Sequence, residues 1–271
     1  MRSLGIELLT VSALPPVEFV NLAADVGCRY ISTGLTAAPY NPHGYPSFSL
    51  RDDAGLRNQM ISAMDDRGVS ISLGEGCLVR AGADVRDLAT DLDRFAELGV
   101  PRINTVSLDP DLDRSLDQFG ALVELAAARG METTVEAVPG LAVGDLDTAL
   151  AALDHVGRPD FRLLIDTMHL VRSGSDAEDI AALDPDRFGY VQLSDAPLRP
   201  RFDSYMEESM YERMVPGDGE LPLRDVLAAL PDDLVISLEV PQRSLAEAGV
   251  GPEERVRRCV DAARALLAEI G

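Results

Sequence analysis

The chain contains no lysine, so all 24 of its basic residues other than histidine are arginines, and 46 acidic residues outnumber them. The formal net charge is therefore −22. A surface of this sign repels phosphate backbones and anionic membranes, so the composition disfavours a nucleic acid or a membrane as partner. We expect the partner to be a small-molecule substrate instead.

Cysteine and long apolar runs are also scarce. The three cysteines, Cys28, Cys77 and Cys259, are odd in number and lack metal-ligand spacing, which is typical of buried thiols in a reducing compartment. No stretch approaches the roughly 20 apolar residues that a membrane helix needs, and the N-terminal sequence MRSLGIELLTV lacks the features of a signal peptide. We therefore expect a cytoplasmic location.

Short apolar runs alternate along the chain with longer stretches of helical periodicity. The predicted strands are Leu4–Val11, Tyr30–Leu35, Ser70–Val79, Arg102–Leu108, Glu132–Val138, Phe161–Asp166, Gly189–Leu193 and Leu234–Val240. The predicted helices are Pro16–Val26, Ala54–Arg67, Val85–Leu98, Arg114–Arg129, Leu146–Val156, Ala177–Leu183, Leu223–Leu230 and Glu253–Ile270. A glycine follows each of the first five helices, where a left-handed C-cap is expected.

Eight strands alternating with eight helices allow either a closed barrel or a doubly wound open sheet. A nucleotide-binding open sheet carries a glycine-rich turn after its first strand, and the sequence TVSALPPVEF contains none. We therefore predict an α/β fold, a (β/α)₈ barrel that forms a single domain over residues 1–271. Two long loops, Thr36–Asp53 and Ala196–Pro222, follow the second and seventh strands and are candidate lids over the active face.

Four late strands each contain a polar residue near the carboxyl end of an otherwise apolar run. These residues are Glu136, Asp166, Gln192 and Glu239. One such residue could be a paired core carboxylate, but carboxylates that converge in a barrel mouth repel one another strongly. A divalent cation resolves this repulsion, and oxygen ligands favour a hard ion, so we predict one Mg²⁺ or Mn²⁺ held by these four residues.

Four further residues are candidates for contact with substrate. His169, three residues after Asp166, is placed for acid/base chemistry; the alternative is a core histidine or one that supports the neighbouring ligands. Arg213 offers a guanidinium to a substrate carboxylate or phosphate. Glu75 could face the cavity from the third strand, and His43 lies in the first long loop, where it is either a substrate contact or an ordinary loop residue.

With these motifs the sequence resembles the xylose isomerase-like family of sugar phosphate isomerases and epimerases, which are TIM barrels. The motifs are VEAVP around Glu136, LLIDTMHL around Asp166, YVQLSD around Gln192, PGDGE at residues 216–220 and SLEVP around Glu239. The resemblance implies a metal held by residues of strands five to eight. The strand-seven ligand of such enzymes is usually histidine, and this chain has Gln192 there. It also implies a homodimer or homotetramer.

The resemblance implies two reaction classes. The first is a metal-dependent isomerase or epimerase of a small sugar, ketose or sugar phosphate, in which Glu136 and Glu239 take and return a proton through an enediolate. The second is a lyase similar to 3-dehydroshikimate dehydratase, with His169 as base; that branch also has glutamine at the position of Gln192 and a serine and an arginine spaced like Ser209 and Arg213. A non-catalytic binding barrel is a minor alternative. The nuclease branch of the superfamily fits poorly, because it needs several histidine ligands and a basic surface.

Overall fold

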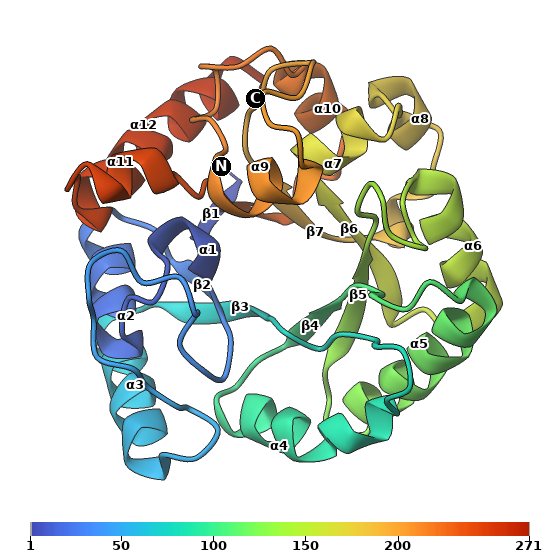
Figure 1. The fold of residues 1–271 in the computed structure, drawn as a ribbon, viewed down its shortest axis with the longest axis horizontal. Coiled ribbons are helices and arrows are strands. Elements are labelled where there is room, and N and C mark those ends of the chain that lie inside the picture. The colour runs from blue at the N-terminus through green and yellow to red at the C-terminus, as the bar shows by residue number, and fades with distance from the viewer. Residues whose placement is uncertain (1, 271) are drawn as a thin grey trace.

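Eight short parallel strands close into a ring (Figure 1). The structure is a computed structural model and describes residues 2–270. The strands are β1 (Ser3–Ile6), β2 (Tyr30–Thr33), β3 (Ser70–Gly74), β4 (Arg102–Thr105), β5 (Glu132–Glu136), β6 (Phe161–Asp166), β7 (Phe188–Leu193) and β8 (Val235–Leu238). Each strand pairs with its neighbours in sequence, and β1 pairs with β8. The predicted (β/α)₈ barrel is therefore confirmed.

Helices surround the ring of strands. They are α2 (Pro16–Asp25), α3 (Ala54–Arg67), α4 (Ala89–Glu97) preceded by the 3₁₀ turn η1 (Val85–Leu88), α5 (Leu112–Ala127), α6 (Leu146–Val156), α8 (Ala177–Ala181), α10 (Leu223–Ala229) and α12 (Pro252–Ile270). These correspond to the eight predicted helices, within about two residues at most ends. The 3₁₀ turn η2 (Pro185–Arg187) precedes β7. Within residues 2–270, no helix combines the length and apolar character needed to cross a bilayer.

Four short helices were not predicted, and all follow the carboxyl ends of strands. They are α1 (Leu8–Val11), α7 (Thr167–Arg172), α9 (Tyr205–Tyr211) and α11 (Arg243–Glu247). The prediction of one strand over Leu4–Val11 is wrong, because the strand ends at Ile6 and the next apolar residues form α1. In that turn, Thr10 Oγ1 donates to the Leu238 carbonyl at 2.7 Å, which fixes α1 against β8. A short apolar run does not distinguish strand from helix by periodicity.

The predicted glycine caps are confirmed by their backbone angles. Gly68 after α3 and Gly157 after α6 have φ of 64° and 65°, and Gly27, Gly99 and Gly130 have φ between 74° and 76°. This left-handed conformation strains residues that carry a Cβ atom. Each glycine thus ends its helix and turns the chain toward the next strand.

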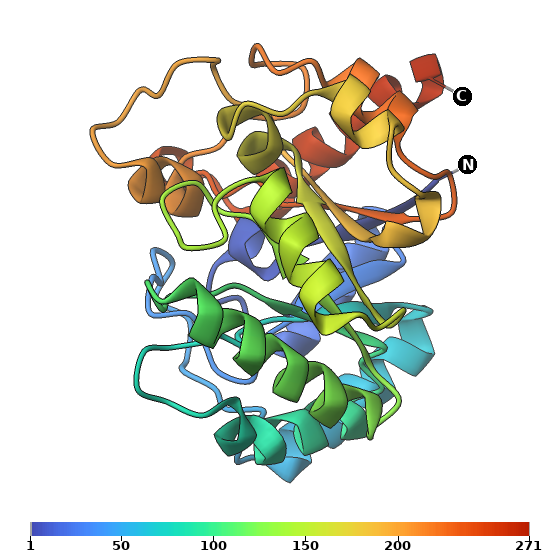
Figure 2. The same ribbon diagram turned by 90° about the vertical axis from the view of Figure 1, so that its right-hand side faces the viewer.

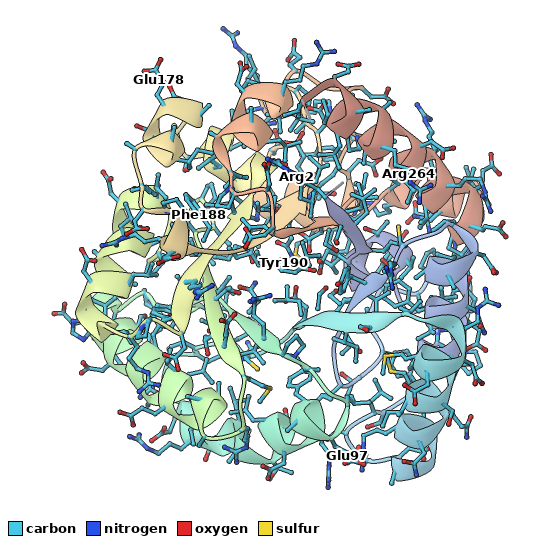
Figure 3. The ribbon with its side chains drawn as sticks, turned by 180° about the vertical axis from the view of Figure 1, so that it is seen from behind. Arg2, Glu97, Glu178, Phe188, Tyr190 and Arg264 are labelled. Atoms are coloured by element: carbon cyan, nitrogen blue, oxygen red, sulfur yellow. The ribbon has the colours of Figure 1, made fainter. Side chains whose placement is uncertain are left out.

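Apolar packing lies mainly between the strands and the surrounding helices. A smaller cluster of Leu73, Leu164 and Tyr190 fills the inside of the barrel. Figure 3 shows Tyr190 near the middle of the ring, seen from the end opposite to Figure 1. The long segment between β7 and β8, which contains α9, extends away from the barrel at one end (Figure 2). The barrel is closed by side chains inside, so a ligand can enter only at a mouth.

Two glycine-to-alanine substitutions should have opposite effects on stability. At Gly189 in β7, an added Cβ would lie 2.7 Å from Thr134 Cγ2 and 3.0 Å from Arg162 Cβ, so overpacking should lower the free energy of unfolding by about 1–3 kcal/mol. At Gly120 in α5 nothing lies within 4 Å, so alanine should raise it by about 0.5–1 kcal/mol. Urea denaturation followed by circular dichroism measures both. Equal stability of the two variants would contradict the assigned packing of Gly189.

Candidate functional site

A cavity of about 610 Å³ lies at the carboxyl ends of the strands. Among its lining residues are six of the candidates from the sequence: Glu75, Glu136, His169, Ser209, Arg213 and Glu239. Asp166 and Gln192 are buried beside it, with 2% and 1% of their surface exposed. The polar residues predicted at the strand ends are therefore gathered at one mouth of the barrel.

Glu136, Asp166 and His169 form the first group, with potential ligand atoms within 4.8 Å of one another. Asp166 ends β6 and caps α7, because its Oδ1 accepts the backbone N–H of His169 at 2.9 Å. Glu136 ends β5, and its Oε2 accepts a hydrogen bond of 2.7 Å from Asn104 Nδ2 on β4. His169 Nε2 lies 3.4 Å from Glu136 Oε1. Because α7 begins directly after β6 at Asp166, His169 lies in this short helix close to both carboxylates.

Arg213 connects this group to Glu239. Its Nη1 pairs with Asp166 Oδ2, and its Nη2 lies 3.0 Å from Glu239 Oε2. Its Nε donates to the Ser209 carbonyl at 2.7 Å, so the side chain is held along its whole length. Arg213 is only 4% exposed, so its positive charge interacts with these two carboxylates instead of with solvent. This interaction stabilises the two buried negative charges.

Gln192 lies on the other side of Glu239. Its Nε2 donates to Glu239 Oε1 at 3.2 Å and to Glu75 Oε1 at 3.3 Å. Its Oε1 is buried and has no hydrogen-bond partner among the described residues. An amide oxygen left without a donor beside carboxylates suits a bound cation.

Glu7, a buried carboxylate that directly follows β1, belongs to the site but was not predicted from the sequence. It is fully buried and accepts a hydrogen bond of 2.9 Å from the Tyr190 hydroxyl, which also lies 2.8 Å from Ser72 Oγ. Carboxylate oxygens of Glu7, Glu75 and Glu239 lie within 4.8 Å of one another. The signal was present, since Glu7 follows an apolar strand just as Glu136 ends one, but the predicted strand extended past it to Val11.

The donor set fits a divalent cation. Glu136, Asp166 and Glu239 supply buried carboxylates around one guanidinium, and the carbonyl oxygen of Gln192 is unpaired. The four predicted ligands are nevertheless divided in the structure: Glu136 and Asp166 group with His169, whereas Glu239 groups with Glu7 and Glu75. Arg213 lies between the two groups.

Burial sets the ionisation of these residues. Burial, together with the negative charge of Asp166, raises the pKa of Glu136 to about 8. Burial also opposes ionisation of Asp166, but the charges of Arg213 and His169 outweigh it and hold the pKa of Asp166 at about 2. For His169, burial lowers the pKa to about 4. At neutral pH the site therefore contains an ionised Asp166, a neutral His169 and a largely protonated Glu136.

The remaining candidates have different surroundings. Ser209, in α9, lines the cavity, and its Oγ donates to the Met206 carbonyl at 3.3 Å. His43 is not among the cavity-lining residues; its ring lies 5.7 Å from that of Tyr45, and its buried Nε2 has no partner among the described residues. The structure thus favours the loop-residue interpretation for His43.

The PGDGE turn is organised by a residue that the sequence analysis did not select. Asp195, just after β7, accepts backbone N–H groups of Gly217 at 2.9 Å, Gly219 at 3.0 Å and Leu221 at 3.1 Å. A Cβ at position 219 would lie 2.2 Å from Asp195 Oδ1, so glycine is required there. This motif therefore shapes the loop that carries Arg213 toward the cavity.

The family model that matches residues 20–266 describes a xylose isomerase-like TIM barrel. The chain belongs to this family. Among the solved structures of similar fold is the IolI protein, which contains a bound zinc atom; it has a TM-score of 0.82 and 18% identity, with 100% of this chain and 99% of that chain covered.

Two curated relatives are 3-dehydroshikimate dehydratases. The protein from Pseudomonas aeruginosa is 29% identical over 161 residues, which cover 57% of this chain and 25% of the relative. The protein from Pseudomonas putida is 26% identical over 190 residues, which cover 65% of this chain and 30% of the relative. The aligned regions thus span less than a third of the length of either relative.

The affinity of the site for a divalent ion should increase with pH. Because the pKa of Glu136 is raised to about 8, the side chain must lose a proton to bind metal below that pH. We expect the dissociation constant for Mn²⁺ to fall at least tenfold for each unit between pH 6 and 8, because burial also raises the pKa of Glu239, a second predicted ligand. Titration calorimetry in buffers of different ionisation enthalpy should also show proton release at pH 7.

The matched control is His155→Gln, since His155 is a surface residue of α6 that pairs with Asp117. This variant should keep the pH dependence, whereas Glu136→Gln should lose much of it. Affinity independent of pH between 6 and 8 in the wild-type protein would exclude Glu136 as a ligand.

Proposed function

We propose that the protein is a divalent-metal-dependent lyase that removes water from a small cyclic hydroxy-keto acid of the dehydroshikimate type. The observation that carries the proposal is the charge of the cavity. The similarity to two 3-dehydroshikimate dehydratases and the presence of Gln192 at the end of β7 also support it.

Burial raises the pKa of Glu7 and Glu75, which favours their neutral forms. With these two neutral, the cavity has one cation more than its remaining carboxylates require. A divalent ion and Arg213 together balance three ionised ligands, Glu136, Asp166 and Glu239. Of the other arginines that line the cavity, Arg51 forms two hydrogen bonds of 2.6 Å with Asp91. Arg80 has no ion-pair partner within residues 2–270. In a protein with a net charge of −22, an unpaired guanidinium at the cavity favours an anionic substrate.

Arg80 is thus better placed than Arg213 to bind a substrate carboxylate, because the guanidinium of Arg213 already bridges two carboxylates. The backbone around Arg80 is also anchored. Val79 N–H donates to the Val106 carbonyl at 3.1 Å, and Arg114 Nη1 donates to the Arg80 carbonyl at 3.0 Å. A fixed backbone holds a binding side chain within a narrow range of positions.

Apolar side chains form much of the remaining cavity wall. They come from the loops after β2, β3, β4 and β5 and from α9, and include Leu35, Leu78, Leu108, Leu141 and Met206. Such a wall suits the carbon ring of a cyclic substrate and the flat ring of an aromatic product. An open-chain sugar, with a hydroxyl on almost every carbon, would leave these hydroxyls without partners.

When bound, a divalent ion would polarise the substrate carbonyl and acidify the adjacent C–H. The pKa of His169 is lowered to about 4, so the ring is uncharged at neutral pH and one of its nitrogens can accept this proton, while the electron pair of the C–H bond moves into a new carbon–carbon double bond. The β C–O bond breaks, and the departing hydroxyl receives a proton from the imidazolium, so one water is lost. Asp166 and Glu136 lie beside the imidazolium and stabilise its charge.

An isomerase or epimerase is the second candidate. Glu136 and Glu239 both line the cavity, on strands β5 and just after β8, and could exchange protons on two faces of a ketose. This reaction shares proton abstraction with the lyase but loses no water. A binding barrel without catalysis would neither abstract a proton from its ligand nor release water.

Dehydroshikimate incubated with the Mn²⁺-loaded protein should develop the ultraviolet absorbance of a catechol acid. His169→Ala should abolish this turnover while metal content, measured by mass spectrometry, stays at one ion per chain. A panel of ketoses in deuterium oxide tests the second candidate. Deuterium uptake by a ketose, with no absorbance from dehydroshikimate, would overturn the lyase in favour of the isomerase; neither signal would leave a binding barrel.

Arg80→Ala should raise KM for dehydroshikimate by about 10- to 100-fold with a small effect on kcat, because it removes one charge-assisted contact of about 1.5–3 kcal/mol. Arg86→Ala is the matched control: it removes the same charge from the exposed turn η1, where Arg86 pairs with Asp84, and should leave KM unchanged. Steady-state kinetics of the wild type and the two variants measure KM and kcat. An equal rise in both variants would indicate a general charge effect instead of a specific contact.

A further inference from the structure

A contact between two helices of the barrel mouth bears on the chemistry of His169. Tyr205 is the first residue of α9, in the segment between β7 and β8, and His169 lies in α7, after β6. The Tyr205 hydroxyl is 2.5 Å from His169 Nδ1, and the two ring centroids are 5.6 Å apart. The candidate lid thus contacts the candidate base directly.

A second polar pair holds the same two helices together. Arg172 Nη2 lies 3.3 Å from Glu208 Oε2, and Glu208 is fully buried. Arg172 follows His169 by three residues, and Glu208 follows Tyr205 by three residues, so both pairs lie on the facing sides of α7 and α9. The contact between Tyr205 and His169 is therefore part of a built helix–helix interface.

The two nitrogens of His169 have different surroundings. Nδ1 faces the Tyr205 hydroxyl, whereas Nε2 is 3.4 Å from Glu136 Oε1 without hydrogen-bond geometry between them. His169 and Glu136 line the cavity, and Tyr205 is not among the lining residues. Nε2 is accordingly the nitrogen on the substrate side.

We propose that Tyr205 is a positioning residue: its hydroxyl oxygen accepts the Nδ1–H of His169, fixes the ring, and leaves Nε2 unprotonated toward the substrate. In a neutral imidazole the hydrogen bond at one nitrogen decides which nitrogen carries the proton. The reverse tautomer would place an N–H at Nε2 with no acceptor in hydrogen-bond geometry. Tyr205 is only partly buried, so its own proton can be donated to water.

The catalytic part of this inference rests on the proposed lyase function, in which Nε2 accepts the substrate proton. The assignment of the His169 tautomer to the contact with Tyr205 does not depend on that function. The ring nitrogens of a histidine report its tautomer in ¹⁵N NMR spectra, independently of any substrate. Because the chain has only three histidines, His43 and His155 supply two reference signals for His169.

The test uses the Tyr205→Phe variant of the protein loaded with Mg²⁺, which is diamagnetic and leaves the NMR signals observable, with Tyr211→Phe as the matched control. Tyr211 ends the same helix, but its ring packs against Tyr40 and Arg243. In wild type and control we expect His169 with the proton on Nδ1. In Tyr205→Phe we expect a proton on Nε2 in a substantial fraction, and a kcat lower by about 10- to 100-fold with KM within twofold.

Two results would overturn the proposal. One is a wild-type His169 that carries its proton on Nε2; the other is a Tyr205→Phe variant whose tautomer matches that of wild type. If no tested compound turns over, the lyase function fails, and the NMR result alone decides whether Tyr205 sets the tautomer. Unchanged signals of His43 and His155 show that the variant is folded.

Discussion

Mutual repulsion among buried carboxylates is the constraint around which this barrel mouth is organised. Glu7, Glu75, Glu136, Asp166 and Glu239 are brought together by strands whose spacing is fixed by the closed sheet. In surroundings of low polarity, neighbouring negative charges raise each other's free energy by several kcal/mol. The protein can hold them only by adding cations or by leaving some of them protonated.

The structure uses both solutions. Arg213 pairs with Asp166 and Glu239, and the pKa of Glu136 is raised to about 8, so much of it carries a proton at neutral pH. Burial and the neighbouring Glu7 and Glu136 also raise the pKa of Glu75. A site of this kind releases protons when it binds a divalent ion. The net charge of the occupied site then depends on the charge of the substrate that enters.

The fold and most of the mouth could be predicted from the sequence because they depend on local patterns. Alternating apolar runs and glycine caps predicted the βα units, and the absence of a glycine-rich turn after the first strand favoured a closed barrel. A polar residue at the end of an apolar strand predicted Glu136, Asp166, Gln192 and Glu239. Glu7 carries the same signal but was hidden by a strand predicted five residues too long at its end. His43 was a candidate because of its loop alone, and the loop folds so that His43 lies outside the cavity lining.

Contacts between distant segments could not be predicted, because they depend on how loops fold over the barrel. The bridge formed by Arg213, the interaction of Tyr205 with His169, and the turn around Asp195 all join residues 22 or more positions apart. The four short helices at the mouth have the same origin. They are too brief for periodicity to indicate them, and their positions are set by buried polar partners such as Glu208.

The double role of Asp166 has a consequence for how such a protein can diversify. One carboxylate oxygen begins α7 and the other faces Arg213, so the direction of the helix, and with it the ring of His169, is tied to the cation-binding group. The loops after β2, β3 and β4, which supply most of the apolar wall and Arg80, are not part of this unit. Descendants could therefore acquire new substrates by exchanging those loops while the reactive centre is inherited intact.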